Sequence, residues 1–246
     1  MSNPVFKNFE SEAERVNDIA YQQNSIMTVD GTLQVVGIMG IIMAVAAYYT
    51  WSRFSLGYMD IATMLTGIGA IAGFVLAIII SFTKVKYLVP FYAVCEGFFL
   101  GGISAVFEAS YPGIVAKAIT GTFAALFAMI ILYRLKFITC TDKFRSTIII
   151  STVSIAGIYL IDIIGRILLH HSVPIINDAT PLGILVSVVI VIVAALNLII
   201  DFDFIEKGSQ MMLPKDYEWY GAFGLMVTVV WLYVEILRLL AKLQRR

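Results

Sequence analysis

Charged residues are scarce in this chain. They make up 14% of its 246 residues, whereas 60% of the residues are hydrophobic. A soluble domain has about a quarter charged residues and about half apolar ones. The excess of apolar side chains requires an apolar surrounding, which a lipid bilayer supplies. The 17 basic and 17 acidic residues cancel, so no basic surplus indicates a nucleic-acid partner.

Cysteines and catalytic motifs are also few. Cys95 and Cys140 form neither a metal-ligand spacing nor a disulfide framework. The sequence contains no H-x-x-x-H pair, no nucleophile elbow and no phosphate-binding glycine loop. We therefore expect neither an enzyme nor a resident cofactor.

Long apolar runs make up most of the sequence. A spanning helix needs about 20 apolar residues to cross about 30 Å of hydrocarbon. The runs are too long for barrel strands and lack strict alternation, so we predict an all-α membrane protein with seven transmembrane helices. The predicted spans are about 33–52, 62–83, 88–108, 113–133, 146–166, 182–205 and 220–240.

The N-terminal segment differs from the rest of the chain. Residues 1–32 are polar, rich in carboxylates and unlike a secretory signal. We expect a cytoplasmic segment over 1–32, with a short interfacial helix as one option, and a transmembrane domain over 33–246.

Lys and Arg counts in the loops give the orientation. Five lie on the C-terminal side of the predicted bundle, and ten lie on the N-terminal side: Lys7, Arg15, Lys84, Lys86, Arg134, Lys136, Lys143, Arg145, Lys207 and Lys215. The bias places the N-terminus in the cytoplasm. Seven spans would then put the basic tail 242–246 outside, so the last run could instead be a re-entrant or partial span.

Two glycine pairs mark faces where helices could touch. Gly69 and Gly73, and likewise Gly97 and Gly101, have the four-residue spacing that lets two membrane helices approach closely. We expect helix packing at these faces.

Acidic residues inside apolar runs are the candidate functional groups. An ionisable side chain in hydrocarbon costs about 2.5–3.5 kcal/mol on insertion scales and needs a partner or a water-filled cavity. The candidates are Glu96, Asp162, Asp201, Asp203, Glu235 and the basic Arg238.

Glu235 lies well inside the last apolar run, near the middle of the bilayer. It follows Gly224 by 11 residues, about 16 Å along a helix. Arg238, one turn further, could pair with it, either as an internal ion pair or as part of a functional site. Asp162 precedes Arg166 by four residues, which favours a structural pair.

Asp201 and Asp203 lie near the end of the sixth run. Two residues apart on a helix is about 200°, so their carboxylates should point in opposite directions and only one should face the interior. If the helix continues to Lys207, Asp201 is the deeper residue. Alternatively, both aspartates simply mark a solvated helix end.

Acids on neighbouring spans could act together. Two carboxylates that meet in a low dielectric share one proton, which would make a pH-dependent latch. Once deprotonated, their oxygens could attract a hard cation such as Ca²⁺. Glu96, beside Gly97, could line the same cavity or pair with Arg238.

Three C-terminal blocks resemble a known family. The runs 201–206, 219–225 and 231–240 are similar to those of the Bax inhibitor-1 (transmembrane Bax inhibitor motif) family, and more narrowly to its bacterial YccA-like branch. Residues 3–5, 27–32 and 96–101 fit the same branch, so the resemblance covers nearly the whole chain.

The resemblance implies a seven-helix, pH-sensitive Ca²⁺ leak channel in a bacterial inner membrane. In relatives, a proton-sharing pair of acids on the sixth and seventh helices gates the pore. Glu235 takes the place of one acid and Asp201 or Asp203 that of the other, and all three could contact Ca²⁺ weakly. Arg238 and Glu96 would be accessory to the pore.

Two other functions stay open. Bacterial members have been linked to modulation of a membrane protease, so the chain could be an interaction module in a stress response. A proton-coupled transporter would require internal repeats, and the sequence shows no internal symmetry.

Overall fold

The computed structural model describes residues 25–169, 176 and 178–245, and in this part of the chain it is all-helical apart from one isolated bridge. Seven long helices are apolar enough to cross a membrane, which confirms the predicted fold class. They are α2 (Val29–Ser55), α3 (Met59–Thr83), α4 (Val89–Ser110), α5 (Ile114–Arg134), α6 (Asp142–Ile164), α8 (Pro181–Gln210) and α9 (Tyr217–Gln244). A short 3₁₀ helix, η1 (Lys86–Leu88), precedes α4, and a π-helix, η2 (Gly165–Leu169), follows α6.

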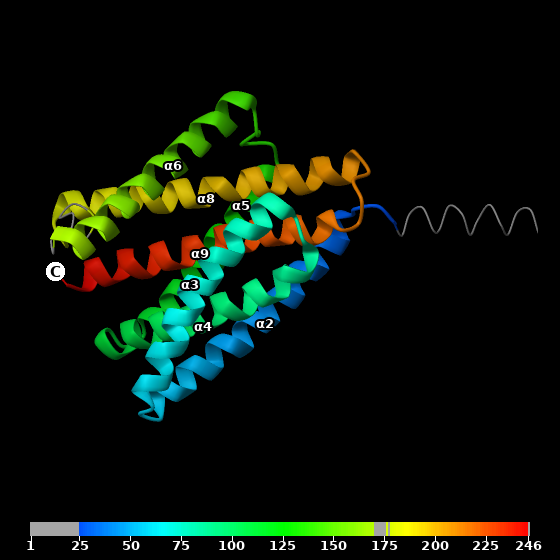
Figure 1. The fold of residues 1–246 in the computed structure, drawn as a ribbon. Coiled ribbons are helices and arrows are strands. Elements are labelled where there is room, and N and C mark those ends of the chain that lie inside the picture. The colour runs from blue at the N-terminus through cyan, green and yellow to red at the C-terminus, as the bar shows by residue number, and fades with distance from the viewer. Residues whose placement is uncertain (1–24, 170–175, 177, 246) are drawn as a thin grey trace, which may run out of the picture.

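Helix α9 is the centre of the bundle. It packs against α8, α2, α5 and α4, and Figure 1 shows it running between α8 on one side and α2 to α4 on the other. Half of its most apolar stretch is buried, more than in any other described span. At 28 residues it is about 42 Å long, enough to cross the hydrocarbon completely. The helix is therefore long enough for a full span, and the alternative of a partial or re-entrant last span stays a prediction.

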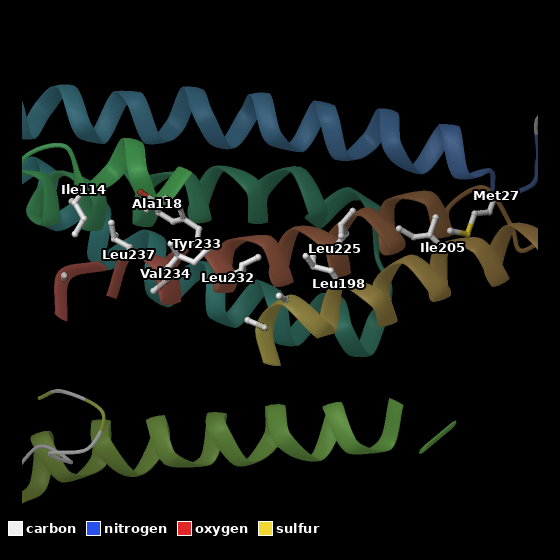
Figure 2. Close-up of a cluster of buried hydrophobic side chains, with 14 residues drawn as sticks. Met27, Ile114, Ala118, Leu198, Ile205, Leu225, Leu232, Tyr233, Val234 and Leu237 are labelled. Carbon is white, nitrogen blue, oxygen red and sulfur yellow. The ribbon is translucent and has the colours of Figure 1, made fainter. Parts of the chain in front are cut away.

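The main core lies where α9 meets α5 and α8. Figure 2 shows Leu237 of α9 beside Ile114 and Ala118 of α5, and Leu232 further along α9 toward Leu198 of α8. These side chains are almost completely buried. Packing on several sides explains why buried residues occur along most of α9, from Glu218 to Lys242.

The helices α2, α3 and α4 pack through the predicted glycines. A Cβ atom on Gly97 would lie 2.5 Å from the Met43 carbonyl oxygen, and one on Gly101 would lie 2.2 Å from that of Ala47. On the other face of α4, a Cβ on Gly69 would lie 2.5 Å from the Cys95 carbonyl oxygen. The predicted close packing is confirmed, because only hydrogen fits at these positions.

The start of α2 is tied to the loop between α8 and α9. The Met27 backbone N–H donates to the Leu213 carbonyl (2.7 Å), and the Met27 side chain is fully buried. Thr28 caps α2 and donates from its backbone and its hydroxyl to Glu218 Oε1, both at 3.0 Å. These contacts start the helix at Val29, before the predicted span. The predicted N-terminal interfacial helix falls in residues 1–24, outside the described part.

Helix α6 lies at the edge of the bundle, next to α8 (Figure 1). Only 11% of its most apolar stretch is buried, so most of its surface is left for lipid. Among the described contacts, Arg145 and Thr152 of α6 bond to α8, and Tyr159 of α6 bonds to α9. They are spaced by seven residues, about two turns, and therefore share one face of the helix.

Candidate functional site

The carboxylate of Glu235 is buried in the middle of the bundle, and the residue is 2% exposed. The Tyr159 hydroxyl of α6 lies 2.8 Å from each of its oxygens and donates to them, and Trp231 Nε1 donates to Oε1 at 3.2 Å. Arg238 Nη1 lies 3.5 Å from Oε1, which confirms the predicted pair. Its guanidinium also lies over the Tyr159 ring, 5.1 Å from the centroid.

Asp201 points from α8 toward α9. Its Oδ1 would lie 3.7 Å from a Cβ atom placed on Gly224, and the Thr228 side chain is within hydrogen-bonding reach. Its Oδ2 is buried without a hydrogen-bond partner among the described residues. A carboxylate oxygen in this state is costly to desolvate, which makes Asp201 a candidate for a functional role.

Asp203 points the other way, toward α6. It forms ion pairs with Arg145 Nη2 at 2.5 Å and with Lys207 Nζ at 2.8 Å, and it is 6% exposed. The predicted opposite directions of the two aspartates are confirmed, but the expectation that only one of them faces the interior is wrong, because Asp203 is buried against α6 and Asp201 Oδ2 is buried as well. Because α8 continues to Gln210, neither aspartate marks the end of the helix.

The structure does not bring these three acids together. No described hydrogen bond or ion pair joins Glu235 to Asp201 or Asp203. Asp201 lies beside Thr228, and Glu235 follows Thr228 on α9 by seven residues, which is about 10 Å along the helix. Within 25–169, 176 and 178–245, no group of three His, Cys, Asp or Glu residues could hold a metal ion.

A cavity of about 750 Å³ lies beside Glu235. Arg238 and Lys242 also line this cavity. Glu96 lines it too, which agrees with one of the two alternatives predicted for that residue. Asp162 and Arg166 reach it from α6 and η2, and their predicted ion pair is confirmed at 2.9 Å.

A second cavity of about 370 Å³ holds Asp201. Ser81 and Tyr220 line it as well. Ala77 of α3 and Val227 of α9 line both cavities. The two acid-lined spaces therefore adjoin at these two small apolar side chains.

Comparison with known proteins identifies the family of the chain. The family described as Bax inhibitor 1 like matches residues 3–245. The chain belongs to this family. No curated protein and no solved structure matched it. With seven candidate spans, this Bax inhibitor 1-like protein is a multi-pass membrane protein. The family resemblance of the sequence is confirmed, while its YccA-like branch stays a prediction.

Two site residues of this Bax inhibitor 1-like protein escaped the sequence analysis. Tyr159 was one of many aromatic residues in apolar runs, although its spacing from Thr152 and Arg145 was a usable signal. Lys242 was counted with the basic tail, but it lies within α9 and is 6% exposed. Its ammonium group donates to the Gly183 carbonyl (3.1 Å) and to Ser187 Oγ (2.6 Å).

Proposed function

We propose that this Bax inhibitor 1-like protein is a pH-sensitive cation leak channel that passes Ca²⁺ across a bacterial inner membrane, with its N-terminus in the cytoplasm. Its YccA-like sequence blocks favour the bacterial branch. One observation carries the proposal. Glu96, Glu235 and Asp201 line two cavities that adjoin along α9.

The cavities and acids suit a hydrated cation. A volume of about 750 Å³ has room for many waters, since each occupies about 30 Å³ in the liquid. Carboxylate oxygens are the preferred ligands of Ca²⁺. Acids placed in succession, rather than gathered in one cage, favour passage over tight binding, because a permeant ion must also leave each site.

Ala77 and Val227 would form the barrier in this pathway. They border both cavities and offer no polar group to an ion. A narrow apolar stretch excludes water and blocks conduction. Opening would require a small displacement of α3 relative to α9.

The pH dependence would arise from the carboxylates. Deprotonation adds negative charge that attracts cations and repels neighbouring acids, so the leak should increase as pH rises. A proton shared by Asp201 and Glu235 would need the two helices to shift by about 10 Å. Separate protonation of the two acids needs no such movement. It would also make the leak increase as pH rises.

The test is Ca²⁺ flux into proteoliposomes at a series of pH values. Wild-type flux should rise with pH, and Asp201→Asn combined with Glu235→Gln should reduce the rise at least severalfold. Glu206→Gln is the matched control, because Glu206 is an exposed acid on α8 outside both cavities. Absence of flux in the wild type, or an unchanged pH profile in the double variant, would overturn the proposal.

The interaction-module hypothesis makes a different prediction. It requires the polar N-terminus or a helix face, and not the charge of the acids, for capture of a membrane protease. Deletion of residues 1–24 tests it and keeps Met27 and Thr28, which tie the start of α2 to Leu213 and Glu218. Loss of protease capture together with unchanged flux would favour this second hypothesis.

A further inference from the structure

One face of α9 is cationic at its C-terminal end. Arg238, Lys242 and Arg245 follow Glu235 at intervals of three or four residues, so they form a stripe on one side of the helix. All four line the large cavity, and Arg166 of η2 faces the same space. Among these cations, Lys242 is buried, whereas Arg166, Arg238 and Arg245 reach the cavity from partly or largely exposed positions.

Two of these cations, Lys242 and Arg245, have no ion pair with another described residue. Arg166 pairs with Asp162, and Arg238 pairs with Glu235. Lys242 instead donates to a backbone carbonyl and to a serine hydroxyl, and Arg245 donates to the Tyr111 hydroxyl at 2.8 Å.

The acids near Lys242 do not fully neutralise the positive charge of its ammonium group. Glu235 and the exposed Asp178 act on it electrostatically without a described contact, and Glu235 is shared with Arg238. A buried ammonium group whose hydrogen bonds go only to neutral partners is costly. An anion at this end of the cavity would offset that cost.

The rest of the cavity is apolar. Phe99, Phe107 and Val234 line its walls, and Phe74 of α3, which also lines it, is 67% exposed on the outside of the bundle. The cavity therefore reaches the surface that faces lipid. Its volume of about 750 Å³ lies in the range of ligand sites, about 300–1,000 Å³.

We propose that this cavity binds an anionic phospholipid from the surrounding bilayer. Its phosphate lies at Lys242 and Arg245, and an acyl chain follows Phe99, Phe107 and Val234. Basic pockets between membrane helices are suited to anionic head groups. A free phosphate would use only the cationic end and leave the apolar walls uncovered, so the combination of the two favours a lipid. The lipid would occupy the same cavity as the proposed cation pathway, so bound lipid would compete with hydrated cations there, and the lipid-binding test below is separate from the flux test.

Ordinary snorkelling of basic residues does not account for Lys242. Lysines near helix ends extend toward water, as Lys117 does at the start of α5, where it is exposed. Lys242 is 6% exposed and bonds inward to α8. Lys117 belongs to the helix whose Ile114 and Ala118 pack against the end of α9, so it is a matched surface control.

Native mass spectrometry of the purified full chain with phosphatidylglycerol or phosphatidylcholine tests the proposal. Each basic residue contributes about 1 kcal/mol to attraction of anionic lipid, so phosphatidylglycerol should bind about tenfold more tightly or better. Lys242→Gln with Arg245→Gln should abolish this preference, Lys242→Arg should retain it, and Lys117→Gln should leave it unchanged.

A single variant and a competition with inorganic phosphate complete the mass spectrometry experiment. Arg245→Gln alone keeps the buried lysine, so it should weaken the preference even if the double variant does not fold. Millimolar inorganic phosphate should not displace the lipid. Equal binding of the two lipids, full preference in the Arg245→Gln variant, an equal loss in Lys117→Gln, or displacement by phosphate would each overturn the proposal.

Discussion

The Tyr159 hydroxyl on the outermost helix lies 2.8 Å from both carboxylate oxygens of Glu235 on the central helix. It joins two other hydrogen bonds that link α6 to α8 in the part of the chain that the structure describes, namely Arg145 with Asp203 and Thr152 with Asn197. Because α6 buries few apolar side chains, these bonds contribute much of its attachment. Two of the three involve predicted gating acids, so the protonation of those acids bears directly on the position of α6.

Removal of the Tyr159 hydroxyl should loosen α6. Tyr159→Phe keeps the ring and loses a hydrogen bond that is worth about 1–2 kcal/mol between membrane helices. Amide hydrogen exchange within α6 should become about tenfold faster, as measured by mass spectrometry in nanodiscs. Tyr133→Phe is the control, since it removes a tyrosine–acid bond to Glu206 outside both cavities. Equal exchange in wild type and Tyr159→Phe would contradict this role.

Neutralising Asp203 should destabilise the protein. Asp203→Asn leaves Arg145 and Lys207 without their carboxylate. Both cations are partly exposed, so the loss should lie between the ~0–1 kcal/mol of a surface pair and the ~3–5 kcal/mol of a buried one. The measurement is the midpoint of thermal unfolding in detergent. The same change at Asp216, whose side chain is 60% exposed in its pair with Lys86, should have almost no effect.

A methyl group at Gly101 should disrupt the contact between α2 and α4. In Gly101→Ala, the new Cβ would lie 2.2 Å from the Ala47 carbonyl oxygen, and backbone cannot move away as a side chain can. Overpacking of this kind costs about 1–3 kcal/mol or more. Gly37→Ala, on the open face of α2 with nothing within 4 Å, should be neutral or slightly stabilising. The measurement is the midpoint of thermal unfolding of the two variants. Similar midpoints for both would argue against tight packing of α2 against α4.

The thiol of Cys140 should report on the Asp203 ion pair. Burial raises the pKa of this loop cysteine, Arg145 lowers it, and the Asp203 carboxylate raises it. The thiolate is the nucleophile, so a raised pKa means less thiolate and slow alkylation by iodoacetamide at pH 8. In a Cys95→Ala background, unfolding should speed the reaction, and Asp203→Asn should also speed it by removing negative charge. A rate unaffected by Asp203→Asn would show that the two groups do not interact.

Contacts within one helix were predictable from spacing. The pairs of Asp162 with Arg166 and of Glu235 with Arg238 follow from residues one turn apart. The opposite directions of Asp201 and Asp203 follow from helical rotation. Which neighbour each aspartate meets did not follow, because that depends on how α8 is rotated against α6 and α9.

The sequence by itself determined the seven spans, their approximate ends, the glycine faces and the family blocks, because each is a property of about 20 consecutive residues and of the bilayer that surrounds them. Only the tertiary structure decided that α9 is central, that Tyr159 meets Glu235, that Lys242 turns inward to Ser187, and that Asp201 occupies a separate cavity. These outcomes depend on the relative rotation and depth of helices far apart in the chain. Lipid matches almost any apolar face, so the apolar pattern alone leaves that rotation undetermined.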